Sequence, residues 1–224
     1  MTDAAENRRP LASRKLGIWQ WSARALARTG VTPNAISSVG MLFGIGSGVA
    51  LGCTALAPDP WWRVLFFAGA TLTQLRLLCN MLDGMVAQEQ GSASPVGELF
   101  NEIPDRISDS ATLIGLGYAL GGNARLGYAA ALIAMFTAYV RAMGKSATGV
   151  QQFCGPMSKP QRMFTVTVAA AFCALAPLAW QPTLQLWEPM GVPALALLLI
   201  CAGASVCALR RIARTAVLLR KAAP

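Results

Sequence analysis

Histidine is absent from this 224-residue chain, and charged residues of either sign are few. Without an imidazole, the chain cannot use histidine as a general acid or base, and carboxylates become the expected ligands for any metal ion. Hydrophobic residues make up 54% of the sequence and charged residues only 13%, which is unlike the composition of soluble globular domains. The shortage of charge therefore predicts a protein whose solvent is the lipid bilayer.

Other common sequence signals are also missing. The six cysteines form no Cys-x2-Cys pair, so they are expected to act as small apolar residues rather than as a metal or redox motif. The start of the chain contains arginines and no sustained apolar run, so no cleavable signal peptide is expected. No internal repeat or second domain stands out, and we expect one membrane domain over residues 1–224.

Six apolar runs are long enough for spanning helices, at roughly 20 residues for each crossing. Before them, a stretch at about 11–29 mixes tryptophan with arginine, which is typical of an amphipathic helix in the membrane interface; a disordered basic tail is the alternative. The expected fold is an all-α integral membrane protein with six transmembrane helices and this N-terminal interfacial helix. The expected spans are residues 35–57, 61–86, 97–121, 124–145, 161–180 and 191–210.

Lysine and arginine give the chain a net charge of +9 and are distributed unevenly. Six precede the first span, four lie between residues 141 and 162 and five follow residue 209, all on segments that six spans place on one side. Only Arg63 and Arg125 fall in the opposite loops. This asymmetry predicts cytoplasmic termini and a cytoplasmic mouth for any site, and it favours a role in topology over binding of nucleic acid.

Acidic residues are scarce, yet six of the ten lie between positions 83 and 109. Ionisable residues within spans are costly and usually face a bundle interior, so this cluster predicts a functional site. Steps of three and four residues return to one helix face, so two polar faces are expected to oppose each other. The pattern is Asn80-x2-Asp83-Gly84-x2-Ala87-Gln88-x8-Gly97-x3-Asn101-x3-Asp105, followed by Asp109.

This pattern resembles the signature of the CDP-alcohol phosphotransferases, integral membrane enzymes of phospholipid synthesis, which reads Asp-x2-Asp-Gly-x2-Ala-Arg-x8-Gly-x3-Asp-x3-Asp. Asn80 and Asn101 stand at the first and third Asp, and Gln88 stands at the Arg. The resemblance implies transfer of a phosphatidyl group from CDP-diacylglycerol to a small alcohol with release of CMP. It also implies Mg²⁺ or Mn²⁺ as cofactor and a bacterial inner membrane as location, and it leaves a homodimer open.

The resemblance assigns roles residue by residue. Asp83 is implied as the principal metal ligand and Asp105 as both a ligand and the base that deprotonates the alcohol. Asn80 and Asn101 would offer amide oxygens to the metal. Ordinary helix packing is the alternative role for the small residues of the motif. The implied contacts to CDP come from Asn80, Asp83, Gly84, Ala87, Gln88 and Gly97.

The stretch Asp105-Arg106-Ile107-Ser108-Asp109 is similar to that of bacterial phosphatidylinositol phosphate synthases, whose acceptor carries a phosphate. Arg106 is either an acceptor-phosphate ligand or a structural partner of Asp109 or Glu102. A second basic cluster is expected in a cytoplasmic loop, where it binds an anionic acceptor or simply marks topology. Its candidate acceptor ligands are Arg141, Lys159 and Arg162.

Alternatives stay open at two levels. Glu98, Glu102 or Asp109 is a candidate replacement for a missing carboxylate ligand, although Glu98 also suits the start of a helix. A non-enzymatic, lipid-binding or partner-binding member of the family is the rival function. A transporter that uses the acidic cavity as an ion path is less favoured, because inverted repeats are not apparent.

Overall fold

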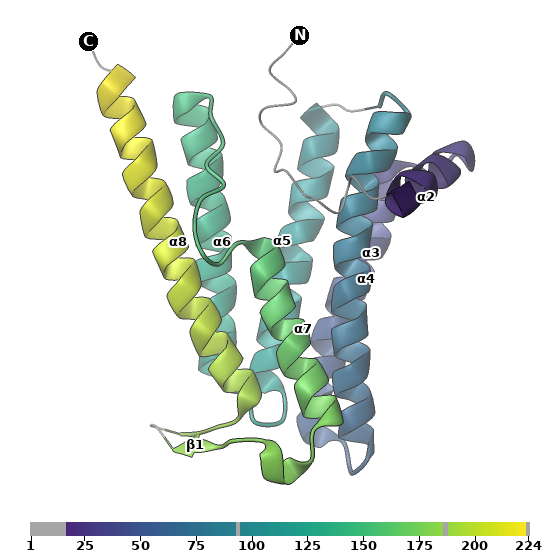
Figure 1. Cartoon of the computed structure of the whole chain (residues 1–224), viewed down its shortest axis with the longest axis vertical. Helices are drawn as coiled ribbons and strands as arrows, with labels where there is room; N and C mark the ends of the chain where they lie inside the picture. The colour runs from purple at the N-terminus through teal and green to yellow at the C-terminus, as the bar shows by residue number, and fades with distance from the viewer. Residues whose placement is uncertain (1–16, 93–94, 186–187, 223–224) are drawn as a thin grey trace.

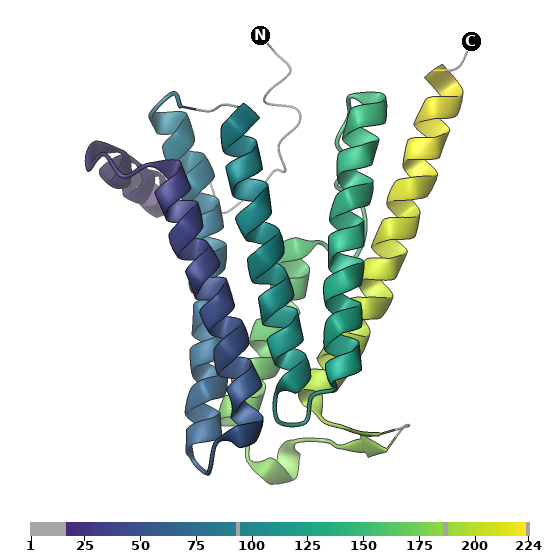
Figure 2. The same ribbon diagram turned by 180° about the vertical axis from the view of Figure 1, so that it is seen from behind.

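The computed structural model describes residues 17–92, 95–185 and 188–222, and in this part of the chain six long helices lie side by side in one bundle (Figures 1 and 2). A shorter helix, α2 (Gly17–Arg28), lies beside one end of this bundle. The expectation of an all-α protein is confirmed. The six long helices are α3 (Pro33–Gly52), α4 (Trp61–Glu89), α5 (Pro95–Tyr118), α6 (Ala124–Thr148), α7 (Lys159–Leu175) and α8 (Val192–Ala222).

Short elements close the end of the bundle that lies opposite α2 (Figure 1). The 3₁₀ turn η2 (Cys53–Leu56) follows α3, and η3 (Leu178–Trp180) follows α7. The strands β1 (Leu184–Gln185) and β2 (Pro189–Met190) pair antiparallel before α8 begins. These elements turn the chain back into the bundle without adding a second layer.

Local sequence explains where the helices begin. Thr32 accepts a hydrogen bond from the N–H of Ala35 at 3.2 Å, and Pro33 occupies the first helical position of α3. Asn123 caps α6 in the same way. A reciprocal capping box between Ser158 and Gln161 starts α7. Capping residues thus satisfy the free N–H groups that each helix start exposes.

Helices α3 and α5 pack so closely that only glycine fits at their contact. A Cβ atom at Gly48 would lie 2.3 Å from the carbonyl oxygen of Ala111, and one at Gly115 would lie 2.1 Å from the carbonyl oxygen of Gly48. Gly44 meets Ser108 in the same manner. Small residues spaced by four let backbones approach in this way within membranes. Helix α3 also packs along α4, whereas α4 and α5 contact each other at few positions.

Two apolar clusters form the interior. The larger one draws on every long helix and gathers around Phe66 of α4 and Leu113 of α5. The smaller one joins α2 to α4, with Ala23 packed near Leu82 and Val86. Many other large apolar side chains are exposed on the outside of the bundle. Such an apolar outer surface suits lipid rather than water.

Among the described residues, four helices are long and apolar enough to cross a membrane: α3 with η2, α4, α6 and α8. Helix α5 carries the acidic cluster, and α7 has only 17 residues. The expected boundaries need two corrections. The sequence predicts a helix up to residue 180, whereas α7 ends at Leu175, ahead of Pro177; it predicts another that ends at 210, whereas α8 continues to Ala222 in a sequence rich in helix-forming residues.

Of the expected N-terminal helix, α2 covers Gly17–Arg28; residues 11–16 of the expected segment lie outside the described part. Its two tryptophans face different surroundings. Trp19 packs against the cluster around Ala23, whereas Trp21 is 68% exposed. A role for α2 in the membrane interface remains a prediction.

The basic cluster does not lie in one cytoplasmic loop, contrary to expectation. Arg141 belongs to α6, and Lys159 and Arg162 belong to α7. The connection over residues 149–158 turns back along the bundle, so that α7 begins about half-way along it (Figure 1). Arg211 holds this connection, donating from Nε to the carbonyl oxygen of Cys154 at 3.2 Å. Non-helical backbone within a membrane protein is tolerated when protein groups satisfy its hydrogen bonds.

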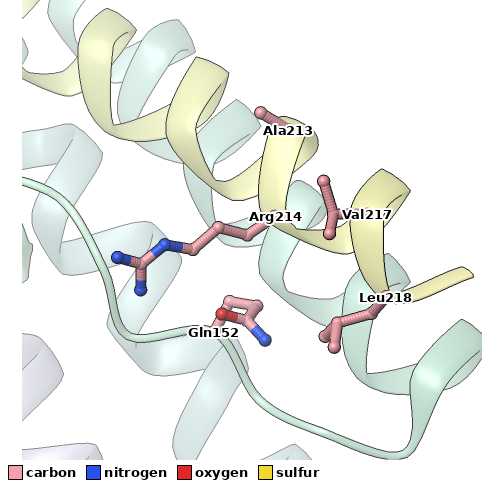
Figure 3. Close-up of a pocket in the computed structure, with 5 residues that line it drawn as sticks. All are labelled: Gln152, Ala213, Arg214, Val217 and Leu218. Carbon is pink, nitrogen blue, oxygen red and sulfur yellow. The ribbon is translucent and has the colours of Figure 1, made fainter. Parts of the chain in front are cut away.

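An open hollow of about 310 Å³ lies along the last turns of α8; Figure 3 shows the residues that line it. Gln152 of the connection faces Arg214, Val217 and Leu218 there. None of the predicted site residues lines it. The hollow is therefore separate from the polar contacts described next.

Candidate active site

The two motif helices meet through the side chain of Asn80. Its Nδ2 donates to Asn101 Oδ1 at 3.1 Å and to Asp105 Oδ1 at 2.9 Å. Asn80 lies on α4, and the two acceptors lie one turn apart on α5. The structure therefore brings three of the four predicted metal-facing residues into one hydrogen-bonded group.

Asp105 is also contacted by two cations. Arg76 forms an ion pair with Asp105 Oδ1, and Lys159 Nζ lies 2.5 Å from Asp105 Oδ2. Arg76 is 2% exposed, and its Nε donates to Ser108 Oγ at 2.7 Å. Both oxygens of Asp105 thus have cationic partners from neighbouring helices.

Asp83, the fourth predicted metal-facing residue, has different surroundings. Ser37 Oγ donates to its Oδ2 at 2.7 Å, and the N–H of Gly84 donates to its Oδ1 at 2.6 Å. Asp83 is 2% exposed, and no described cation forms an ion pair with it. It is a buried carboxylate with neutral partners, in contrast to Asp105.

Lys159 extends the cationic side of the site to Asp109. Its Nζ lies 3.5 Å from Asp109 Oδ1, and Arg162 Nη2 lies 3.8 Å from Asp109 Oδ2. Asp109, Arg162 and Asp105 are all buried. The capping box that starts α7 sets the position of Lys159, because Lys159 follows the capping Ser158 directly.

Glu102 binds the remaining two candidate acceptor ligands. Arg141 Nη2 lies 2.8 Å from Glu102 Oε1 and 2.9 Å from Oε2, and Arg106 Nη2 lies 3.2 Å from Oε1. Arg106 therefore pairs with Glu102, one of the two structural partners that the sequence suggested. Its Nη2 also lies 3.8 Å from Asp105 Oδ2.

The charges of this site do not balance. Four carboxylates belong to it, and five cations from α4, α5, α6 and α7 contact three of them, all except Asp83. One positive charge is therefore left over when all these groups are ionised. In an apolar bundle, such a surplus favours an anionic ligand. The carboxylates are Asp83, Glu102, Asp105 and Asp109, and the cations are Arg76, Arg106, Arg141, Lys159 and Arg162.

The other residues predicted to contact CDP are half-buried or exposed. Gly84 and Ala87 are half-buried on α4, and Gly97 is half-buried on α5. Gln88 is exposed next to the last residue of α4. Their contacts to CDP remain predictions. The side chain of Glu98, a candidate replacement ligand, lies outside the described part of the chain.

A groove of about 420 Å³ opens beside Asn80. Its lining is mostly apolar and joins Trp19 of α2, Leu78 and Met81 of α4, and Pro160 at the start of α7. The groove therefore leads from the polar group at Asn80 to the outer face of α4.

Sequence reasoning missed three residues of the site. Arg76, Ser37 and Ser108 lie outside the family pattern, yet they bind Asp105, Asp83 and Arg76 respectively. Arg76 was detectable, because it lies one helical turn before Asn80 on the same face. The partnership of Ser37 with Asp83 depends on how α3 packs, which no local pattern gives.

Comparison with known proteins places these features in a family. No protein-family model matches the chain. The phosphatidylinositol phosphate synthase of Mycobacterium marinum is 31% identical over 168 residues, covering 72% of this chain and 68% of that protein. The inner membrane protein YnbA of Escherichia coli K12 is 27% identical over 158 residues, covering 70% of this chain and 76% of that protein.

Two solved structures share the fold. The Mycobacterium tuberculosis phosphatidylinositol phosphate synthase with CDP-DAG bound matches with a TM-score of 0.69 at 20% identity, covering 89% of this chain and 94% of that one. Its complex with manganese and citrate gives the same TM-score and identity, with 88% of each chain covered. Together with the relative named as a synthase, the apolar helix bundle and its buried charged site indicate an integral membrane enzyme. By its relatives, the chain belongs to the CDP-alcohol phosphatidyltransferase family.

Proposed function

We propose that this protein transfers a phosphatidyl group from CDP-diacylglycerol to a small alcohol that carries a phosphate, releasing CMP. The observation that carries this proposal is the convergence of cations from four helices on the carboxylates next to Asn80, two of which, Asp105 and Asp109, are buried. The relative from M. marinum, named a phosphatidylinositol phosphate synthase, supports the reaction class. The M. tuberculosis synthase of the same fold, solved with CDP-DAG bound, supports the donor.

The donor set fits a divalent ion of the Mg²⁺ or Mn²⁺ type. Asp83 offers carboxylate oxygens that no described cation neutralises, and the amide oxygen of Asn80 accepts no hydrogen bond from a described residue. Hard cations prefer such oxygen ligands. A bound ion would neutralise charge on the phosphoryl group under attack. The complex of the M. tuberculosis enzyme with manganese supports this cofactor.

Asp105 is the proposed base. The acceptor hydroxyl oxygen forms a bond to the phosphorus of the phosphatidyl group, the bond from that phosphorus to the bridging oxygen breaks, and CMP leaves. The hydroxyl proton passes to Asp105, which must lie within hydrogen-bond reach of it. Because Lys159 and Arg76 contact Asp105 in the free protein, the incoming acceptor takes the place of one of these contacts.

A phosphate on the acceptor suits the four cations of α5, α6 and α7. Arg106 and Arg141 share Glu102, and Lys159 and Arg162 share Asp109. A dianionic phosphate competes well for such cations, since hydrogen bonds between charged groups are stronger than neutral ones. An uncharged alcohol gains none of these contacts.

The groove beside Asn80 suits an acyl chain of the donor. Its apolar lining reaches the outer face of α4, and Asn80 marks its polar end. A lipid whose nucleotide lies at the motif would place its tails along this groove. Trp19 of α2 lines it as well, which is consistent with α2 lying in the cytoplasmic interface.

The proposed topology keeps six spans, with α5 and α7 among them. Charged residues on α5 and α7 would be costly if they faced lipid, but they pair with each other inside the bundle. Both termini are proposed to be cytoplasmic. Cysteines placed at Val150 and Arg220 in a Cys-free chain should label from the cytoplasm only, and one at Arg125 from outside. The opposite pattern would overturn the topology.

The deciding assay uses purified protein, CDP-diacylglycerol and Mg²⁺ or Mn²⁺ with a panel of free and phosphorylated alcohols. Release of CMP and the mass of the lipid product are measured. We expect turnover with a phosphorylated alcohol such as an inositol phosphate. Preference for an uncharged alcohol would contradict the acceptor class, and no CMP release with any alcohol would contradict the proposed function.

A further inference from the structure

The four motif positions divide into two unlike halves. Asp83 accepts hydrogen bonds from Ser37 and the backbone of Gly84, both neutral. Asp105 is bound by Arg76, by Lys159 and by the amide of Asn80. Cations and N–H groups of the protein therefore neutralise Asp105, whereas Asp83 keeps its negative charge.

Asn80 is the residue that makes this division possible. Its amide nitrogen gives two N–H groups, and both Asn101 Oδ1 and Asp105 Oδ1 accept from it. A carboxylate at position 80 would have no proton to donate. It would instead stand at hydrogen-bond distance from the carboxylate of Asp105, where like charges repel strongly. Only a cation placed between them would restore attraction.

The contact between α4 and α5 depends on these polar bonds. The two helices touch at few positions, in contrast to the close packing of each on α3. Asn80 and Arg76, one turn apart on α4, both reach Asp105 on α5. Arg76 is further held by Ser108 Oγ at 2.7 Å. This small group therefore sets how the two halves of the motif face each other.

We infer that Asn80 is a positioning residue: together with Arg76 it fastens α4 to α5 and neutralises Asp105 without a divalent ion, so that the ion binds on the Asp83 side alone. The identity of the ion rests on the proposed function, whereas the fastening does not. The inference makes two separate predictions, one for thermal stability and one for metal binding.

The first experiment measures the melting temperature of the detergent-purified full chain in EDTA and in Mn²⁺. Asn80→Asp should melt well below wild type in EDTA and recover in Mn²⁺, because the ion replaces the lost N–H donors. Wild type should respond less to Mn²⁺. Asn34→Asp, the same change at an exposed position of α3, is the matched control and should melt like wild type in both buffers.

Asn80→Ala keeps the test decisive if Asn80→Asp does not fold. It removes the bridge without adding charge, so its melting temperature should fall by about 3–6 °C, in Mn²⁺ as in EDTA. A melting temperature equal to that of wild type would overturn the fastening role. An Asn80→Asp protein that is as stable as wild type in EDTA, or that Mn²⁺ does not rescue, would overturn it too.

The second experiment titrates Mn²⁺ and follows binding by the loss of the free-ion electron paramagnetic resonance signal. Asp83→Asn should weaken binding at least about tenfold, and Asp105→Asn should leave it within about threefold of wild type. Equal losses in both variants would overturn the one-sided site. Neither experiment needs turnover. A protein that releases no CMP would contradict the proposed function, but the melting and titration results could still be interpreted.

Discussion

Helix α5 makes two contacts of opposite character, one with α3 and one with α4. Against α3 it packs backbone on backbone, at Gly48 and Gly115, where no side chain fits. Against α4 it is joined mainly by polar side chains, through Asn80 and Arg76. The first contact fixes the helices by shape, and the second leaves exchangeable groups between them. A membrane bundle can thus hold a charged site, because the helices that carry the charges are positioned by a third helix.

The largest expected effect comes from removing the carboxylate at the polar contact. Asp105→Asn should lower CMP release by about 10²–10⁴-fold, since the base is lost. Stability should fall as well, because Arg76 and Lys159 lose their shared partner in a buried place. Asp109→Asn is the matched change one turn further on and should be milder in turnover. Equal activity of Asp105→Asn and wild type would remove Asp105 from the mechanism.

Disrupting the glycine contact between α3 and α5 should lower the stability of the fold and leave the catalytic groups unchanged. Gly48→Ala places a methyl group 2.3 Å from the carbonyl oxygen of Ala111, so α3 and α5 must separate, at a cost of about 1–3 kcal/mol. Gly46→Ala is the control on the same helix, because its methyl group would meet Leu72 at an ordinary 3.5 Å. Thermal melting of both variants measures the difference. Similar melting temperatures would contradict the close contact.

The cations of α7 are expected to act on binding of the acceptor substrate. Lys159→Ala should raise the apparent KM for a phosphorylated acceptor by about tenfold and change the KM for CDP-diacylglycerol much less, because one charge-assisted bond is lost. Arg214→Ala, which removes a cation from the hollow of Figure 3, should change neither value. A shift in the donor KM alone would place Lys159 at the nucleotide instead.

The smallest effect is expected from giving the site the full set of family carboxylates. Asn80→Asp combined with Asn101→Asp should tighten Mg²⁺ or Mn²⁺ binding several-fold, because carboxylates bind hard cations better than neutral amides. Turnover need not rise with it. Metal titration of wild type and double variant measures the change. Unchanged metal dependence in a folded double variant would mean that these side chains do not face the metal.

The intervals of the motif predicted part of this site. Steps of three and four residues place Asn80 on one helix face and Asn101 with Asp105 on another, and the structure joins these faces. Lys159 could not be positioned in this way. Its contact with Asp105 depends on the connection over residues 149–158 turning back along the bundle, which is a property of tertiary packing.

The fold, like the site, was predictable only in part. Apolar runs located the helices within a few residues, but they did not give the early end of α7 or the extension of α8. Glycine at every fourth position from Gly40 to Gly52 was visible in the sequence and is typical of close helix contacts. The local sequence does not show which helix packs against this row of glycines. Both α4 and α5 pack on α3, and only the structure assigns Gly48 to α5.

The short length of α7 links the site to the membrane around it. With 17 residues, the helix is about 26 Å long, which is less than the roughly 30 Å of a hydrocarbon core. If its far end lies at one surface of that core, Lys159 lies below the other surface, and an acceptor must descend to reach it. A thinner bilayer shortens this path. We therefore expect turnover in vesicles to depend on the acyl-chain length of the host lipid, with hydrophobic mismatch acting on the reaction through α7.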